Sequence, residues 1–115
     1  MDRKKQLKEE YKQIKQEMGL IGATCLVTGK TYLEATNRTK ASMNKLLFTL
    51  KLGSHRCSEL QKEWKKYGEE AFEIKVIEVL EYDKEDPDRD YSEDLELVKM
   101  DWIDRLKKEG IELMI

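Results

Sequence analysis

Residues 19–37, GLIGATCLVTGKTYLEATN, carry the clearest structural pattern in the sequence. Its first half, Leu20–Val27, is an apolar run of the length expected for a buried strand, and Thr28-Gly29 is a turn signal. A second short segment, Lys30–Ala35, follows the turn. The pattern predicts a β-hairpin with a tight loop between its two strands.

One helix is predicted before this hairpin. Apolar residues recur there at helical spacing, at Leu7, Tyr11, Ile14 and Met18. The remaining positions are Lys, Glu and Gln, which suit a solvated face. We therefore expect an N-terminal helix over residues 1–17, followed by a single compact domain over residues 18–115.

Two helices and a third strand are predicted after the hairpin. The first helix is expected to be capped at residues 36–37 and to stop at Gly53. The second is expected to begin at a capping box made by Ser58 and Gln61. Residues Phe72–Leu80 then alternate between apolar and charged side chains, which indicates a strand.

The chain is expected to close with an acidic surface loop over residues 81–90 and a last helix from Ser92 to Gly110. The order of elements is helix, hairpin, two helices, strand and helix. We therefore predict an α/β fold of the α+β kind, a three-stranded antiparallel sheet flanked by helices.

Charge is divided along the chain. The net charge is −2, but residues 1–66 hold 15 Lys and Arg against 7 Asp and Glu, whereas residues 67–115 hold 7 against 17. This division indicates either an anion-binding half or two solvated faces that attract each other. No apolar run approaches the roughly 20 residues that span a bilayer, and no signal peptide is recognisable, so a cytoplasmic protein without a membrane partner is expected.

Cysteine and histidine offer little metal chemistry. Cys25 and Cys57 are expected to be reduced thiols. The single histidine, His55, follows a Gly-Ser turn, where a loop or capping role is favoured over acid–base work. With no Cys-x-x-Cys pair, neither a zinc site nor a cofactor is predicted.

Short motifs follow one another in a fixed order, namely Gly19-Leu20-Ile21, residues 29–37, Gly53-Ser54-His55, Glu59–Trp64, Tyr67–Phe72 and Trp102-Ile103. Together they resemble the GIY-YIG nuclease domain, which occurs in phage homing endonucleases and in the excinuclease of DNA repair. The resemblance covers residues 18–113. Over residues 53–80 it is greatest to small GIY-YIG-like proteins of Gram-positive bacteria.

The resemblance implies a catalytic site of which this chain retains one group. Tyr32 matches the tyrosine of the second motif. The first-motif tyrosine, which lies at or near the attacking water in active members, is Ile21 here. The arginine that steadies the phosphate is replaced by Ser42, and the metal-binding glutamate by Lys99. Further family positions also differ: a histidine is Leu46, a glycine is Glu34, and a late asparagine is Glu112.

These replacements remove the groups that phosphodiester cleavage needs. The reaction requires an activated water, a cation on the scissile phosphate and charge relief for the leaving oxygen. Lys99 places an ammonium group where Mg²⁺ would bind, and Ser42 cannot replace a guanidinium fork. We expect Ile21, Ser42 and Lys99 to lie around one concave face beside Tyr32, with a positive field and no metal-ligand cluster.

Three hypotheses about function follow. The first is a GIY-YIG domain that has lost endonuclease activity and binds nucleic acid or a protein partner. The second is an active endonuclease with an altered, Mg²⁺-dependent site, for which the acidic residues Glu93, Asp94 and Glu96 are candidates, although they also suit a helix N-terminus. The third is a structural partner domain without nucleic-acid contact. Phosphate contacts, or else plain solvated surface, are expected at Arg38, Lys40, Lys45 and Lys51.

Overall fold

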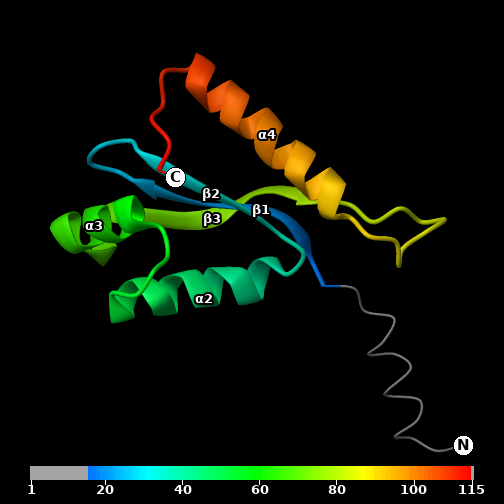
Figure 1. The fold of residues 1–115 in the computed structure, drawn as a ribbon, viewed down its shortest axis with the longest axis horizontal. Coiled ribbons are helices and arrows are strands. Elements are labelled where there is room, and N and C mark those ends of the chain that lie inside the picture. Colours follow the sequence, from blue (N-terminus) through cyan, green and yellow to red (C-terminus); the bar gives the residue numbers. More distant parts are fainter. Residues whose placement is uncertain (1–15, 115) are drawn as a thin grey trace, which may run out of the picture.

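The computed structural model describes residues 16–114. The N-terminal helix expected over residues 1–17 falls outside them, apart from its last two positions, which are in neither helix nor strand. Strands β1 (Met18–Cys25), β2 (Thr31–Thr36) and β3 (Phe72–Leu80) form an antiparallel sheet in the order β2-β1-β3 (Figure 1). The predicted three-stranded antiparallel sheet is therefore confirmed.

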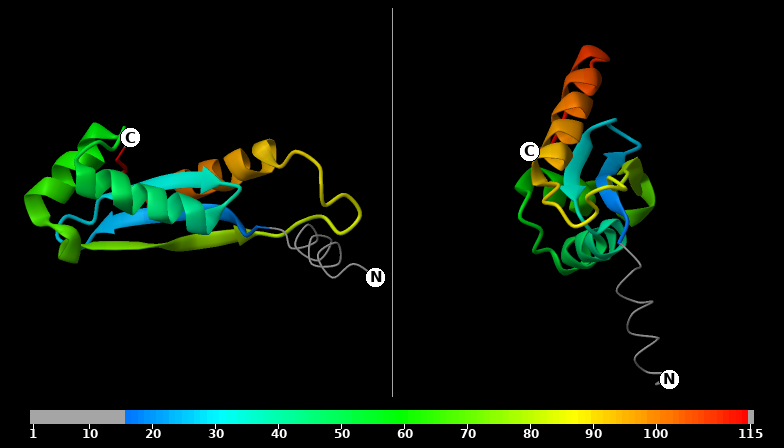
Figure 2. Two further views of the ribbon diagram at one scale, coloured as in Figure 1. Left: turned by 90° about the horizontal axis from the view of Figure 1, so that it is seen from below. Right: turned by 90° about the vertical axis from the view of Figure 1, so that its right-hand side faces the viewer.

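Strand β1 lies in the middle of the sheet because it is apolar on both faces. Helices α2 (Thr39–Leu52) and α3 (Ser58–Tyr67) cover one face, and α4 (Ser92–Lys108) covers the other (Figure 2).

The two faces of β1 enter two separate core clusters. Ile21 packs with Leu60 of α3 on the first face, whereas Met18 packs with Leu95 of α4 on the second. Burial of apolar side chains therefore holds helices α3 and α4 against β1.

The loop of the hairpin is longer than predicted. Strand β1 ends at Cys25, whose backbone N–H donates to the carbonyl oxygen of Lys30 at 2.9 Å. Gly29, with φ of 78°, donates back to the carbonyl of Cys25 at 2.7 Å. Leu26 and Val27 therefore lie exposed in the loop, because these two hydrogen bonds close the hairpin before the apolar run ends.

The start of α2 also differs from the expectation. Its N-cap is Arg38, without a side-chain cap hydrogen bond, so the cap expected at residues 36–37 is wrong. The start of α2 is held instead by the buried Thr39, whose hydroxyl donates to the carboxylate of Glu17 at 2.6 Å. Gly53 stops the helix in the left-handed region, as predicted.

A buried glutamine fixes the loop between α2 and α3. The side-chain amide of Gln61 donates to the carbonyl oxygen of Leu50 at 3.1 Å and accepts from the backbone N–H of His55 at 3.0 Å. The capping box expected from Ser58 and Gln61 is therefore wrong, and the N-cap of α3 is Cys57. The loop over residues 53–57 is held in one position by this amide.

The remaining predictions concern the end of the last helix, the cysteines and membrane spans. Helix α4 ends at Lys108, two residues before the expected stop at Gly110. Cys25 and Cys57 are both free and buried. None of the helices within residues 16–114 is long and apolar enough to cross a membrane.

Candidate functional site

Two of the hollows that border β2 share Glu34, Ala35 and Arg56 in their walls. The first, called the α4 hollow, has a volume of about 480 Å³ and is also lined by Tyr32, Cys57, Glu96, Lys99, Leu113 and Met114. The second, called the α2 hollow, has a volume of about 410 Å³ and is also lined by Ser42, Lys45, Leu46, Thr49, Ser54 and His55. One continuous surface thus runs from α2 across β2 to α4.

The C-terminal segment borders this surface at the start of β2. The backbone N–H of Thr31 donates to the carbonyl of Glu112 at 3.0 Å, and Met114 donates to the carbonyl of Thr31 at 2.9 Å. These bonds form an isolated parallel bridge between Thr31 and Leu113. The part of β2 from Tyr32 to Ala35 lines the two hollows.

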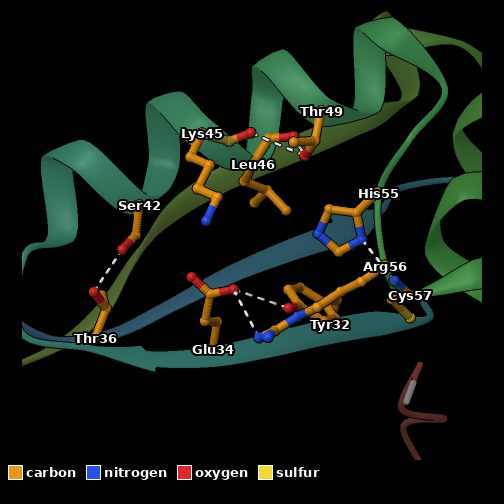
Figure 3. A network of polar contacts seen from close by, with 10 residues as sticks. All are labelled: Tyr32, Glu34, Thr36, Ser42, Lys45, Leu46, Thr49, His55, Arg56 and Cys57. Carbon is orange, nitrogen blue, oxygen red and sulfur yellow. Dashed lines mark hydrogen bonds and ion pairs between the residues drawn. The ribbon is translucent and has the colours of Figure 1, made fainter.

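The hydroxyl of Tyr32 is held by Glu34 (Figure 3). It donates to Glu34 Oε1 at 2.9 Å, because residues two apart on a strand point to the same face. Burial, with a further contribution from the charge of Glu34, raises the pKa of Tyr32 to about 12. A phenol that resists ionisation and already donates to a carboxylate is a poor general base at neutral pH.

Glu34 also pairs with Arg56, which comes from the loop between α2 and α3. Arg56 Nη2 lies 3.6 Å from Glu34 Oε1, and Figure 3 shows the two side chains meeting beside Tyr32. The side chain of Arg56 is 81% exposed, whereas that of Glu34 is 22% exposed. This ion pair stands at the boundary between the two hollows, since both residues line both of them.

The resemblance implied that catalytic groups are replaced at Ile21, Ser42 and Lys99, and two of these three positions line the hollows. Lys99 lines the α4 hollow together with Tyr32, and Ser42 lines the α2 hollow. Ile21 is fully buried and lines neither, although its backbone is the register partner of Glu34. The single concave face expected from the sequence is therefore two hollows that meet at Glu34.

Ser42, Leu46 and Glu112, which match family positions, make contacts that hold the fold together. The hydroxyl of Ser42 is hydrogen-bonded to that of Thr36, which ties α2 to the end of β2. Leu46 is buried in the core between α2 and the sheet. Glu112 is exposed and uses its backbone carbonyl to hold the C-terminal segment, outside both hollows.

The four basic residues proposed as phosphate contacts do not share one face of α2. At about 100° per residue, Arg38 and Lys45 lie roughly 20° apart, as do Lys40 and Lys51, but the two pairs are separated by roughly 120–160°. Only Lys45 lines a hollow, and Figure 3 shows it pointing toward β2. Lys51 instead pairs with Glu69 at 3.5 Å.

Only one of the two hollows has the excess of positive side chains that was expected. In the α4 hollow, Glu34 and Glu96 offset Arg56 and Lys99, so the field expected there is wrong. In the α2 hollow, Arg56 and Lys45 outweigh Glu34. Within the part of the chain that the structure describes, neither Lys45 nor Lys99 forms an ion pair.

The carboxylates of the α4 hollow do not fit a resident Mg²⁺. Of the acidic residues at the start of α4, only Glu96 lines this hollow, and Asp94 pairs with Arg89 at 2.7 Å. No group of three or more His, Cys, Asp and Glu side chains in residues 16–114 could hold a metal ion. Arg56 and Lys99 line the same walls and would repel a divalent cation.

His55 has the loop role that the sequence indicated. Its Nδ1 accepts a hydrogen bond from the backbone N–H of Cys57 at 3.0 Å, so the proton of the neutral ring is on Nε2. The ring meets that of Tyr32 edge-on, with centroids 5.3 Å apart. Burial lowers the pKa of His55 below its usual value.

This burial predicts a pH dependence of stability. Because His55 binds its proton more weakly in the folded state, acid favours the unfolded chain, and the free energy of unfolding should fall as pH drops below about 6.5. Chemical denaturation at several pH values, compared with His55→Gln, measures this difference. Since His55 is the only histidine, its NMR titration reports the folded pKa alone, and a midpoint above 6.5 would contradict the prediction.

Sequence reasoning did not identify Arg56 as a site residue. The one sequence feature that could have indicated Arg56 is its position directly after His55, in the loop between two helices. Glu34 was noted only as the replacement of a glycine, and its contact with Arg56 depends on how Gln61 holds the loop.

Comparison with known proteins identifies the fold. No protein-family model and no curated protein matches this chain. One solved structure that does match is the catalytic domain of the homing endonuclease I-TevI, with a TM-score of 0.61, 20% identity, and 85% of this chain and 98% of that chain covered. A Glu-to-Ala mutant of the catalytic domain of intron endonuclease I-TevI matches with a TM-score of 0.60 and 19% identity over 84% of this chain and 91% of that one. This chain therefore has the GIY-YIG nuclease-like fold.

Proposed function

We propose that this chain is a nucleic-acid-binding domain that does not cut phosphodiester bonds. The observation that carries the proposal is the row of cations along the two hollows, Lys45, Arg56 and Lys99. Two of them, Lys45 and Lys99, have no ion-pair partner among residues 16–114. Amino and guanidinium groups in such a row bind the phosphates of a nucleic-acid backbone.

The absence of cleavage is supported by what surrounds Tyr32. Its hydroxyl donates to Glu34, and its pKa is raised to about 12, so it does not supply a base. Ser42 is tied to Thr36 and has no charge to place on a phosphate. A surface of this kind holds a backbone without activating a water to attack it.

The edge of α2 extends the proposed contact. Arg38 lies at the start of α2, on the same side of the helix axis as Lys45, and is exposed. Lys40 and Lys51 lie on the other side of α2 and are left out of the contact. Because lysine and arginine there meet phosphates rather than base edges, binding should depend little on base sequence.

A salt titration tests this proposal. The affinities for a duplex DNA and for a single-stranded RNA of unrelated sequence are measured by fluorescence anisotropy over a range of salt concentrations. We expect binding of at least one that weakens steeply and linearly on a logarithmic salt scale, because each neutralised phosphate releases counterions. No binding to either would favour a domain that contacts only protein.

One observation favours a second candidate, an endonuclease with an altered catalytic site. Glu96 lines the α4 hollow beside Tyr32, one helical turn before Lys99. A carboxylate in this place could assist a reaction at a bound phosphate. Nicking of DNA that needs a divalent metal ion and disappears in Tyr32→Phe would support this candidate over the first.

A further inference from the structure

Among residues 16–114, Glu34 is the only acidic residue that lines both hollows. Its carboxylate accepts from the hydroxyl of Tyr32 at 2.9 Å and pairs with Arg56 at 3.6 Å. The negative charge of Glu34 therefore lies among Lys45, Arg56 and Lys99, the cations that we propose contact nucleic acid.

We infer that the Glu34 carboxylate occupies the place of a phosphate at Arg56, so that the free domain partly blocks its own nucleic-acid surface. This inference rests on the proposed function. It goes further by naming the residue that limits binding and the contact that must open when a phosphate arrives.

The two anions compete for the same donor. A guanidinium group pairs with carboxylate and phosphate oxygens in the same planar geometry. A backbone that reaches Arg56 while Glu34 stays in place brings two negative charges together. Like charges about 4 Å apart in water cost about a factor of five in affinity.

The burial of the two side chains indicates which of them moves. Arg56 is 81% exposed, and its pairing with Glu34 is a surface contact of small energy, so the guanidinium can turn toward a ligand. Glu34 is only 22% exposed and is anchored by Tyr32. Tyr32 thus serves as a positioning residue that holds the blocking carboxylate in place.

Glu34→Gln tests the inference, with Glu96→Gln as the matched control. Glutamine keeps the size of Glu34 and can still accept from Tyr32, and both variants change the net charge equally. Of these two hollows, Glu96 lines only the α4 hollow, and it forms no ion pair with a described residue. We expect Glu34→Gln to bind DNA or RNA about fivefold more tightly at low salt, with the logarithmic salt slope steeper by about 0.9.

Two further variants exclude simpler explanations. Adding Arg56→Gln to Glu34→Gln should abolish most of the gain, because no guanidinium is then left to take the phosphate. Tyr32→Phe leaves the charge unchanged but releases the carboxylate, and it should tighten binding by about twofold. This variant also provides an independent test if Glu34→Gln fails to fold.

The outcomes separate this inference from the proposed function. Salt-dependent binding by the unmodified chain without any gain in Glu34→Gln, or with an equal gain in Glu96→Gln, would overturn the inference and leave the proposed function standing. A gain that survives Arg56→Gln would also overturn it. Absence of binding by every variant would overturn both.

Discussion

Replacing Gly19 with alanine is expected to destabilise the domain by about 3 kcal/mol, the upper end of what overpacking a core costs. A Cβ at this position would lie 2.0 Å from the carbonyl oxygen of Glu78 and 3.0 Å from Cα of Val79. Both are backbone atoms of the neighbouring strand β3, so they cannot move without disturbing its pairing with β1. The β-bulge between Leu20 and Ile21 lies directly beside this contact.

Gly22→Ala is the matched control for this prediction. Its Cβ would lie 2.3 Å from Cδ1 of Ile77, which is the end of a side chain that can rotate away. We expect a loss of about 1 kcal/mol there. Urea denaturation of both variants measures the difference in the free energy of unfolding. Equal losses would show that the close approach of β1 and β3 at Gly19 is not rigid.

The double variant Lys45→Gln with Lys99→Gln is expected to bind nucleic acid about thirtyfold more weakly. Each lysine should contribute about 1 kcal/mol to a phosphate contact at an exposed site, and about 2 kcal/mol corresponds to this factor. The logarithmic salt slope on duplex DNA should fall by about 1.8, because two fewer phosphates are neutralised. Anisotropy titrations at several salt concentrations measure both quantities.

A matched pair on the other side of α2 controls for net charge. Lys40→Gln with Lys51→Gln removes the same two charges, but Lys51 pairs with Glu69 and neither residue lines the two hollows. We expect this variant to weaken binding by less than threefold. Equal weakening by both double variants would show that the chain attracts nucleic acid through its overall charge rather than at the hollows.

The fold could be predicted because its decisive signals are local. The apolar run that became β1 indicated a buried strand, and Gly53 marked the end of α2. Where local signals conflicted with long-range contacts, the contacts prevailed. Leu26 continues the apolar pattern, but the hairpin closes at Cys25, and Gln61 bonds to Leu50 and His55 rather than to the start of its own helix.

The candidate site could be predicted only in part. The strand pattern placed Tyr32, and the position of Lys99 in the last helix brought it to the same hollow. The contact of Glu34 with Arg56 joins residues from β2 and from the loop between two helices. No periodicity in the sequence specifies such a contact, because it depends on tertiary packing of the loop.

Binding without cleavage is tested by incubating the chain with supercoiled plasmid and Mg²⁺ or Mn²⁺ at low salt, with binding and strand breaks followed in the same samples. We expect a salt-sensitive shift of the plasmid in the gel and, after removal of protein, supercoiled DNA as intact as in the control without protein. Metal-dependent conversion to nicked or linear DNA that is lost in Tyr32→Phe would contradict it.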